Sequence, residues 1–201
     1  MKKIFLLIFL LFITGCMNYN ELNDLAIIKS IGIEYNNDYY IYAEIIEDID
    51  KDNIPKTKVI KASGKNMDEL FNNIKLLVNK EIYLDHIDLL ILDENLNNNN
   101  FQEITKYFIL HQELRNDFYT IIGSDIENIL NNAKYDEIEK MIINNKNDNQ
   151  IIKISFEEII SKYLDHKIFN ISKIIYDNEI KFDGNYQYIN NHLERINHEK
   201  N

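Results

Sequence analysis

The chain has 201 residues, of which 22 are basic and 33 acidic, and its formal net charge at pH 7 is −11. A chain this acidic is repelled by nucleic acid and by anionic lipid headgroups, so we expect no nucleic-acid partner. Its hydrophobic fraction of 45% is ordinary for a globular domain, and its single cysteine excludes a disulfide within the chain.

Residues 1–15 have the pattern of a secretory signal. Two lysines precede an unbroken apolar run over residues 4–13. As a helix this run is about 15 Å long, which is about half of the hydrocarbon core of a bilayer. A basic start, a short apolar run and small residues are typical of a cleaved signal.

The stretch Ile13-Thr14-Gly15-Cys16 resembles the lipobox of bacterial lipoproteins. The resemblance implies cleavage between Gly15 and Cys16 and attachment of a diacylglyceryl group to the cysteine sulfur. Two acyl chains hold a protein firmly on a membrane, whereas one holds it marginally. The alternative is that Cys16 only closes the signal as a small apolar residue. We expect residues 16–24 to form a polar tether between the lipid and the domain.

Strands are predicted in the first part of the domain. Residues 25–35 and 39–46 are rich in β-branched and aromatic side chains, and the turn signal at 36–38 joins them into a hairpin. A charged loop over 47–57 contains the only proline, and a third strand is expected over 58–64.

The hydrophobic period then changes to that of a helix. Asn66 is the expected N-cap, with Glu69 three residues later. The apolar face of this helix is formed by Leu70, Phe71, Ile74, Leu77 and Val78.

A strand and a second helix follow. Residues 86–93 form a continuous apolar segment, which predicts a central strand covered on both faces. The asparagine run at 97–100 is expected to break the chain, and a helix is expected over 101–114.

Another strand and two capped helices are predicted next. The strand covers residues 117–123, and Ser124 with Glu127 forms a capping box for a short helix. Ser155 with Glu158 forms a second capping box. The apolar residues behind it are Phe156, Ile159, Ile160, Tyr163 and Leu164.

Strands return from residue 169, with a tight turn or bulge expected at Asp183-Gly184. Strands that alternate with capped helices, and pair at both ends, predict an α/β (α+β) fold with a mixed sheet and flanking helices. We expect the main domain to cover residues 25–182. Residues 183–201 are expected to be a strand-rich tail that resembles the start of a truncated second domain.

No catalytic or metal-binding motif is present in the sequence. It lacks a nucleophile elbow, a phosphate-binding glycine loop, a zinc-protease helix and a C-x-x-C pair. No two of the five histidines are three or four residues apart, so a helical metal pair is excluded. We therefore expect a protein that is not an enzyme and uses no cofactor.

Four segments in chain order resemble the GerAC, or Ger(x)C, family of spore-germination lipoproteins. The first follows the lipobox, the second leads into the first predicted helix, the third contains the central strand, and the fourth surrounds a glycine near the C-terminal end. The positions that fit the family pattern include Glu21, Leu22, Asn23, Asp24, Leu25, Ala26, Ile27, Gly32, Ile33, Ser63, Gly64, His86, Leu96 and Gly184.

The resemblance implies a lipid-anchored, non-catalytic subunit of a nutrient germinant receptor. Its partners would be integral membrane receptor subunits, and its location the outer face of the spore inner membrane. Typical members of the family are much longer than this chain. The alternative is a solute-binding lipoprotein that serves a transporter, a class that is usually two-lobed.

Overall fold

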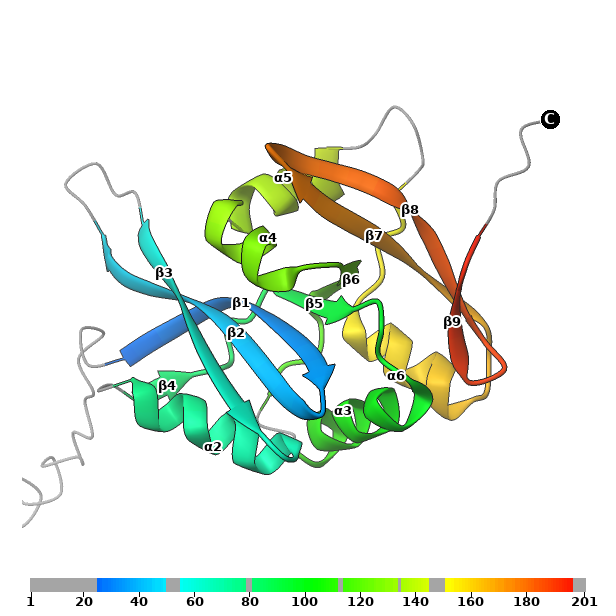
Figure 1. The fold of residues 1–201 in the computed structure, drawn as a ribbon, viewed down its shortest axis with the longest axis horizontal. Coiled ribbons are helices and arrows are strands. Elements are labelled where there is room, and N and C mark those ends of the chain that lie inside the picture. Colours follow the sequence, from blue (N-terminus) through cyan, green and yellow to red (C-terminus); the bar gives the residue numbers. More distant parts are fainter. Residues whose placement is uncertain are drawn as a thin grey trace, which may run out of the picture.

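The computed structural model describes residues 25–49, 55–78, 81–111, 114–133, 135–144 and 151–196. These residues form one mixed β-sheet with helices packed on both of its faces (Figure 1). The expected α+β fold with a mixed sheet and flanking helices is therefore confirmed.

The sheet has nine strands within the described residues. Its order is β3-β2-β1-β5-β6-β7-β8-β9, and the short strand β4 pairs with β1. The strands β1, β5, β6 and β7 run parallel, whereas β2 and β3 at one end and β8 and β9 at the other are antiparallel to their neighbours. The strands are β1 (Leu25–Asn36), β2 (Asp38–Ile49), β3 (Pro55–Gly64), β4 (Glu81–Tyr83), β5 (Leu89–Asp93), β6 (Tyr119–Gly123), β7 (Phe169–Asp177), β8 (Glu179–Ile189) and β9 (His192–Arg195).

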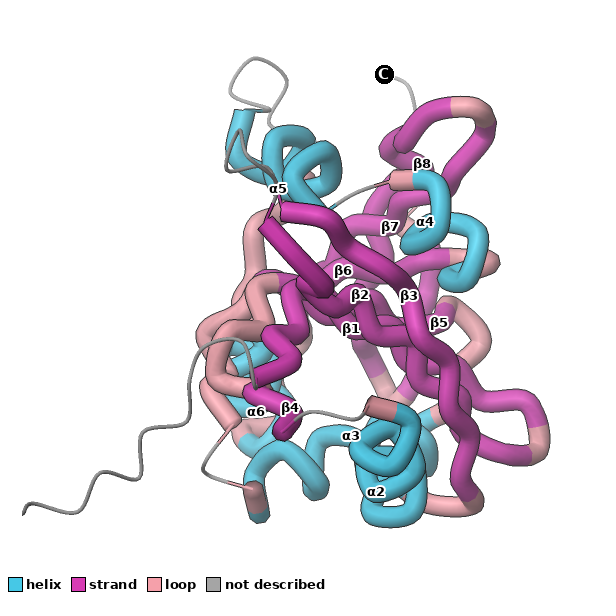
Figure 2. Tube along the Cα trace, turned by 90° about the vertical axis from the view of Figure 1, so that its left-hand side faces the viewer, coloured by secondary structure: helices cyan, strands magenta, loops and turns pink. Residues whose placement is uncertain are grey.

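The described part of the chain contains five helices in two layers. Three of them pack on one face of the sheet and two on the other, as Figures 1 and 2 both show. The first layer consists of α2 (Met67–Leu77), α3 (Asn98–Leu110) and α6 (Phe156–Leu164). The second consists of α4 (Ile126–Asn132) and α5 (Tyr135–Asn144).

The central strand β5 shows why both layers are needed. Leu90 and Leu92 belong to the hydrophobic core beneath the first layer, while Leu89 and Ile91 belong to the core beneath the second. Successive side chains of a strand point to opposite faces, so a continuous apolar run is buried only when both faces are covered. The prediction of a central strand is confirmed, although the strand begins at Leu89 and not at residue 86.

The asparagine run after β5 starts a helix, so the prediction of a chain break is wrong. The side chain of Asn97 accepts hydrogen bonds from the backbone N–H groups of Asn99 and Asn100, at 2.9 and 3.1 Å. In return, the Asn100 side chain accepts from the Asn97 N–H group at 3.2 Å. This reciprocal cap satisfies donors that a helix start leaves unpaired, and α3 therefore begins at residue 98.

The N-cap of α4 also differs from the prediction. Asp125, not Ser124, caps the helix, with a φ of 57° in the left-handed region. Glu34 at the end of β1 completes this helix start, because its carboxylate accepts from the Ile126 N–H group at 3.1 Å and from the Tyr42 hydroxyl at 2.9 Å. A residue 92 positions away thus supplies part of the cap, which local sequence could not indicate.

We expect the burial of Glu34 to make stability depend on pH. Burial is the main cause that raises the pKa of Glu34 above its ordinary value of 4.5. A carboxyl with a raised folded pKa stabilises the fold most below its unfolded pKa, and this contribution is lost as the pH rises through the folded pKa. The stability of the wild type relative to Glu34→Gln should therefore fall as the pH rises past 4.5, the ordinary value for this carboxyl.

Urea unfolding of the wild type and of Glu34→Gln at pH values below and above 4.5 measures the difference in stability. The exposed Glu137→Gln variant is the control and should keep a constant offset from the wild type. A constant offset for Glu34→Gln as well would contradict the assignment.

Other predicted boundaries need smaller corrections. The charged loop over 47–57 is shorter than expected, because β2 continues to Ile49 and β3 begins at Pro55. The cap of α2 is confirmed, since the Asn66 side chain accepts from the Glu69 N–H group at 2.9 Å. Leu77, however, is 59% exposed and does not belong to the apolar face of this helix.

The third predicted cap is also confirmed, because the Ser155 hydroxyl accepts from the Glu158 N–H group at 3.2 Å. Leu164, at the end of α6, is 59% exposed where burial was expected. The sequence analysis did not predict α5 or the three-residue strand β4.

The C-terminal strands contain the expected bulge. Ser172 of β7 lies opposite Asn185, while Ile174 lies opposite Phe182, so β8 carries one extra residue at Asp183-Gly184. Gly184 has a φ of +104°, which side-chain-bearing residues rarely adopt. The boundary expected between residues 182 and 183 falls inside β8. That residues 183–201 begin a second domain stays a prediction.

Candidate functional site between α2 and α3

The glycines of the family pattern lie far apart in the fold. Gly32 in β1 passes beneath α4, and a Cβ atom there would lie 2.1 Å from Cγ2 of Ile126. Gly64 ends β3 against α2, where a Cβ atom would lie 2.5 Å from the backbone nitrogen of Leu70. Gly184 forms the bulge of β8. Gly32 and Gly64 therefore allow helices to pack closely on the sheet, and the three glycines do not form a common site.

The remaining pattern positions are also scattered. Leu25 begins β1, Ser63 precedes Gly64 at the end of β3, and His86 is exposed between β4 and β5. The positions that lie outside the described residues are Gly15, Cys16, Glu21, Leu22, Asn23 and Asp24.

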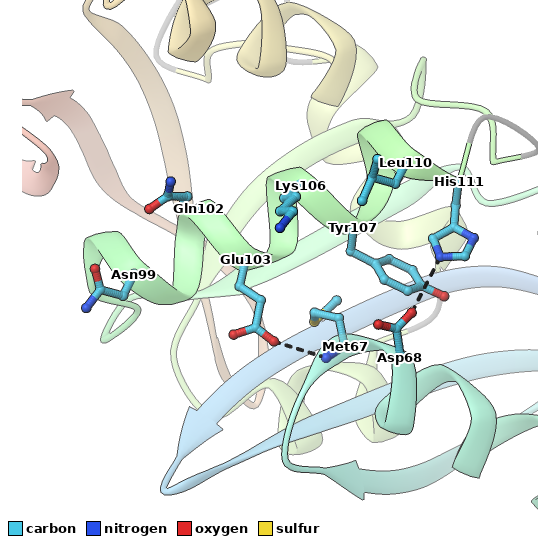
Figure 3. A pocket seen from close by; sticks show the side chains of 9 residues that line it. All are labelled: Met67, Asp68, Asn99, Gln102, Glu103, Lys106, Tyr107, Leu110 and His111. Atoms are coloured by element: carbon cyan, nitrogen blue, oxygen red, sulfur yellow. Dashed lines mark hydrogen bonds and ion pairs between the residues drawn. The ribbon is translucent and has the colours of Figure 1, made fainter.

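A groove between the start of α2 and one side of α3 is the best candidate for a binding site (Figure 3). It encloses about 490 Å³, within the usual range for ligand pockets of about 300–1,000 Å³. Its lining residues are Met67, Asp68, Asn99, Gln102, Glu103, Lys106, Tyr107, Leu110 and His111.

Glu103 fixes the geometry of the groove. Its carboxylate accepts from the backbone N–H group of Met67 at 3.2 Å and from the Tyr39 hydroxyl at 2.9 Å. The Asn100 side chain donates to the same hydroxyl at 3.2 Å. Burial is the main cause that raises the pKa of Tyr39 to about 12. The hydrogen bond from Asn100 lowers this pKa, and the Glu103 carboxylate raises it further. The first turn of α2, the middle of α3 and β2 are thus joined by one hydrogen-bonded network.

The other end of the groove is closed by a second contact between the helices. Nε2 of His111 lies 3.6 Å from a carboxylate oxygen of Asp68, and the Tyr107 ring lies 4.2 Å from the His111 ring, centroid to centroid. Figure 3 shows these three side chains on one side of Met67 and Glu103 on the other.

This arrangement is suited to recognition through hydrogen bonds. The amides of Asn99 and Gln102 and the ammonium of Lys106 are exposed along α3, above a floor that includes the buried Met67. Amide and ammonium groups can donate to a polar ligand or to the backbone of a partner. The groove lining has no serine, threonine or cysteine. Among the described residues no group of three or more histidine, cysteine or acidic side chains could hold a metal ion.

A buried charged cluster lies beside the bulge at Gly184. The side chain of Lys173 is 8% exposed, and its ammonium lies 2.8 Å from Glu94 and 3.0 Å from Asp183. Burial alone would lower the pKa of Lys173, but the hydrogen bonds to the two carboxylates outweigh it, so the pKa is raised. Arg195 of β9 also contacts Asp183, at 3.1 Å. The cluster therefore ties β7, β8 and β9 to the end of β5.

We expect Lys173→Met to lower the free energy of unfolding by about 2 kcal/mol, because two partly buried carboxylates lose their shared cation. Urea unfolding measures this loss. Lys181→Met is the matched control, since Lys181 forms an exposed ion pair with Asp177 within the same strand pair. Equal effects of the two substitutions would contradict the structural role of the cluster.

Sequence reasoning missed the groove and the charged cluster. Glu103 is 36 residues from Met67, and Lys173 is 79 residues from Glu94. Only the tertiary fold brings these partners together, and their local sequence contains no motif that could have indicated them.

The described residues thus form an α+β domain with a polar groove between two helices of one layer. Within the described residues, none of the helices is both long and apolar enough to cross a membrane. A family model described as "Spore germination protein N-terminal domain" matches residues 18–174, and the chain belongs to this family. The resemblance to the GerAC family is therefore confirmed.

One curated relative agrees with this assignment. The chain is 28% identical over 107 residues to "Spore germination protein KC" of Bacillus subtilis (strain 168). The alignment covers 46% of this chain and 26% of the relative. No solved structure matches the chain.

Proposed function

We propose that the protein is a non-catalytic subunit of a nutrient germinant receptor, held on the outer face of the spore inner membrane by a lipid on Cys16. Family membership over residues 18–174 is the observation that carries this proposal. The name of the B. subtilis relative supports a role in spore germination. Integral membrane subunits of the receptor are the proposed partners, and the groove between α2 and α3 is the proposed place of contact.

The transporter alternative has less support. Solute-binding proteins of transporters usually close two lobes around their ligand, whereas the described residues form one continuous sheet. The groove lies between two helices of a single layer.

Deletion of the gene tests the receptor role. Mutant spores are expected to germinate more slowly on at least one nutrient, and a copy of the wild-type gene should restore the rate. Normal germination of the mutant on every nutrient tested would refute the proposal.

Complementation with groove variants tests the site separately. The triple variant Asn99→Ala, Gln102→Ala and Lys106→Ala removes exposed polar groups and should fold normally but fail to restore germination. The control is Glu137→Ala with Lys140→Ala on the exposed side of α5. If the groove variant restores germination fully, the groove is not the contact, although the receptor role would stand.

A further inference from the structure

The last turn of α2 carries two adjacent leucines that are exposed. Leu76 is 80% exposed and Leu77 is 59% exposed, and Leu76 is the most exposed large hydrophobic side chain among the described residues. The core beneath this helix contains Phe71 and Ile74 but neither leucine. Exposed apolar surface of this kind marks a contact with a partner or with a membrane.

The end of α2 lies next to β4 and the start of β1 (Figure 1). Glu81 of β4 follows Leu77 by four residues, so their Cα atoms are at most about 14 Å apart. Glu81 pairs with Leu25 of β1, and paired strands are about 4.8 Å apart. The Cα atom of Leu77 is therefore within about 19 Å of that of Leu25, where the described part of the fold begins.

The lipid proposed on Cys16 would hold this side of the domain close to the bilayer. Cys16 precedes Leu25 by nine residues, which span at most about 32 Å when fully extended. A short tether also gives a second contact an effective concentration of about millimolar, so that contacts too weak to hold the free domain can form. Two leucines beside the tether are suited to such a contact.

The charges around the leucines suit a bilayer surface. Neither β3 nor the last two turns of α2, residues 71–77, contain an acidic residue, although the chain has a net charge of −11. Lys75 of α2 is exposed. Lys56 and Lys58 of β3 are also exposed, and they share the face of Ile60, which packs on the core beneath α2. Lysines beside an apolar contact offset the repulsion between an acidic domain and anionic headgroups.

We propose that Leu76 and Leu77 enter the boundary between the headgroups and the acyl chains of the bilayer, as a second membrane contact beside the lipid. This inference rests on the lipid anchor of the proposed function. The contact fixes the orientation of the domain, which a flexible tether alone would leave free to rotate. Met67, at the groove between α2 and α3, lies about 15 Å from Leu77 along the same helix, so the groove is held close to the membrane surface.

The test uses the lipidated protein in vesicles of phosphatidylcholine and phosphatidylglycerol that contain a nitroxide-labelled lipid. A fluorescent dye is attached to Leu76→Cys or, as the matched control, to Leu164→Cys. Leu164 is 59% exposed and ends α6, which contacts β8 at the other end of the sheet through Tyr163 and Tyr188. The nitroxide should quench the dye at position 76 at least about threefold more than the dye at 164, because interfacial side chains lie about 5–10 Å deep. Equal quenching would overturn the proposal.

The wild type distinguishes failure of the anchor from failure of this inference. A lipidated Cys16 has no free thiol, so the dye should not label the wild-type protein. Labelling of the wild type would refute the anchor and this inference with it. Equal quenching at the two positions of a lipidated protein would refute the inference alone.

A dye on Asn72→Cys, one turn earlier on the exposed side of α2, tests the two leucines themselves. Adding Leu76→Ser and Leu77→Ser should lower the quenching of this dye about threefold, because the apolar contact with the bilayer is lost. Adding Leu164→Ser should leave the quenching unchanged. Unchanged quenching in the double serine variant would refute the contact.

Two other occupants of this surface would be recognised in the same experiment. Quenching that appears only in vesicles containing spore membrane proteins would identify a protein partner. Quenching that rises with the ratio of protein to lipid would identify a second copy of the chain. Either result would overturn the proposal.

Discussion

The Cys16→Ala protein is expected to leave the membrane fraction almost completely. Cys16, the single cysteine of the chain, directly follows Gly15 in the lipobox-like stretch. Without the sulfur of this cysteine no lipid of this kind can be attached. Each buried methylene contributes about 0.8 kcal/mol to membrane binding, so loss of the two proposed acyl chains would remove far more than surface contacts supply. The acidic domain gains little from anionic headgroups.

Fractionation of cells that express each variant, followed by immunoblotting, measures this change. Met17→Ala alters the next residue and should leave the protein in the membrane fraction. Mass spectrometry of the wild-type product should find the diacylglyceryl group on Cys16. A Cys16→Ala protein that stays fully membrane-bound would show that something other than this lipid holds it.

Gly64→Ala is expected to lower the free energy of unfolding by about 3 kcal/mol, the largest loss we predict for a single methyl group. A Cβ atom at this position would lie 2.5 Å from the backbone nitrogen and 2.8 Å from the Cα atom of Leu70. Backbone atoms cannot rotate away as a side chain can, so α2 would have to move off the end of β3. That movement would also disturb the bond between Met67 and Glu103.

Thermal and urea unfolding of the purified variant test this prediction. Ser63→Ala, one residue earlier and exposed, is the control and should change stability by less than about 0.5 kcal/mol. A Gly64→Ala protein as stable as the wild type would show that the contact between β3 and α2 is looser than the structure indicates.

The sequence predicted the elements whose residues share one local period. The apolar run of β5 and the helical spacing of Phe71 and Ile74 in α2 reflect burial on particular faces, and both elements occur in the structure. Three-residue β4 is too short to produce a period. The buried residues described in α5 are Ile138 and Ile142, among acidic neighbours, and this signal was too weak to recognise.

Caps were harder to predict where the backbone conformation decides them. The asparagine run at 97–100 has the composition of a loop, yet Asn97 and Asn100 cap each other because the side-chain oxygen of each accepts from the backbone N–H group of the other. At α4 a left-handed Asp125 and the distant carboxylate of Glu34 replace the expected Ser124. Neighbouring residues in the sequence do not indicate the left-handed conformation of Asp125 or its proximity to the distant Glu34.

The candidate site could not be predicted because all of its defining contacts are long-range. Two of the family positions, Gly32 and Gly64, allow helices to pack on the sheet, and neither glycine lines the groove around Glu103. Pattern recognition therefore identified the architecture of the domain and its family, while the structure was needed to find surfaces that could bind a partner.

The central position of β1 determines how the domain would respond to mechanical load. β1 lies inside the sheet, with β2 on one side and β4 and β5 on the other. Any pull transmitted through the residues before Leu25 enters the fold along this strand. Such a force loads the hydrogen bonds on both sides of β1 in shear, so that they must break together and not one by one. If the proposed tether pulls along β1, the strand would resist tension better than an edge strand, whose hydrogen bonds can open one at a time.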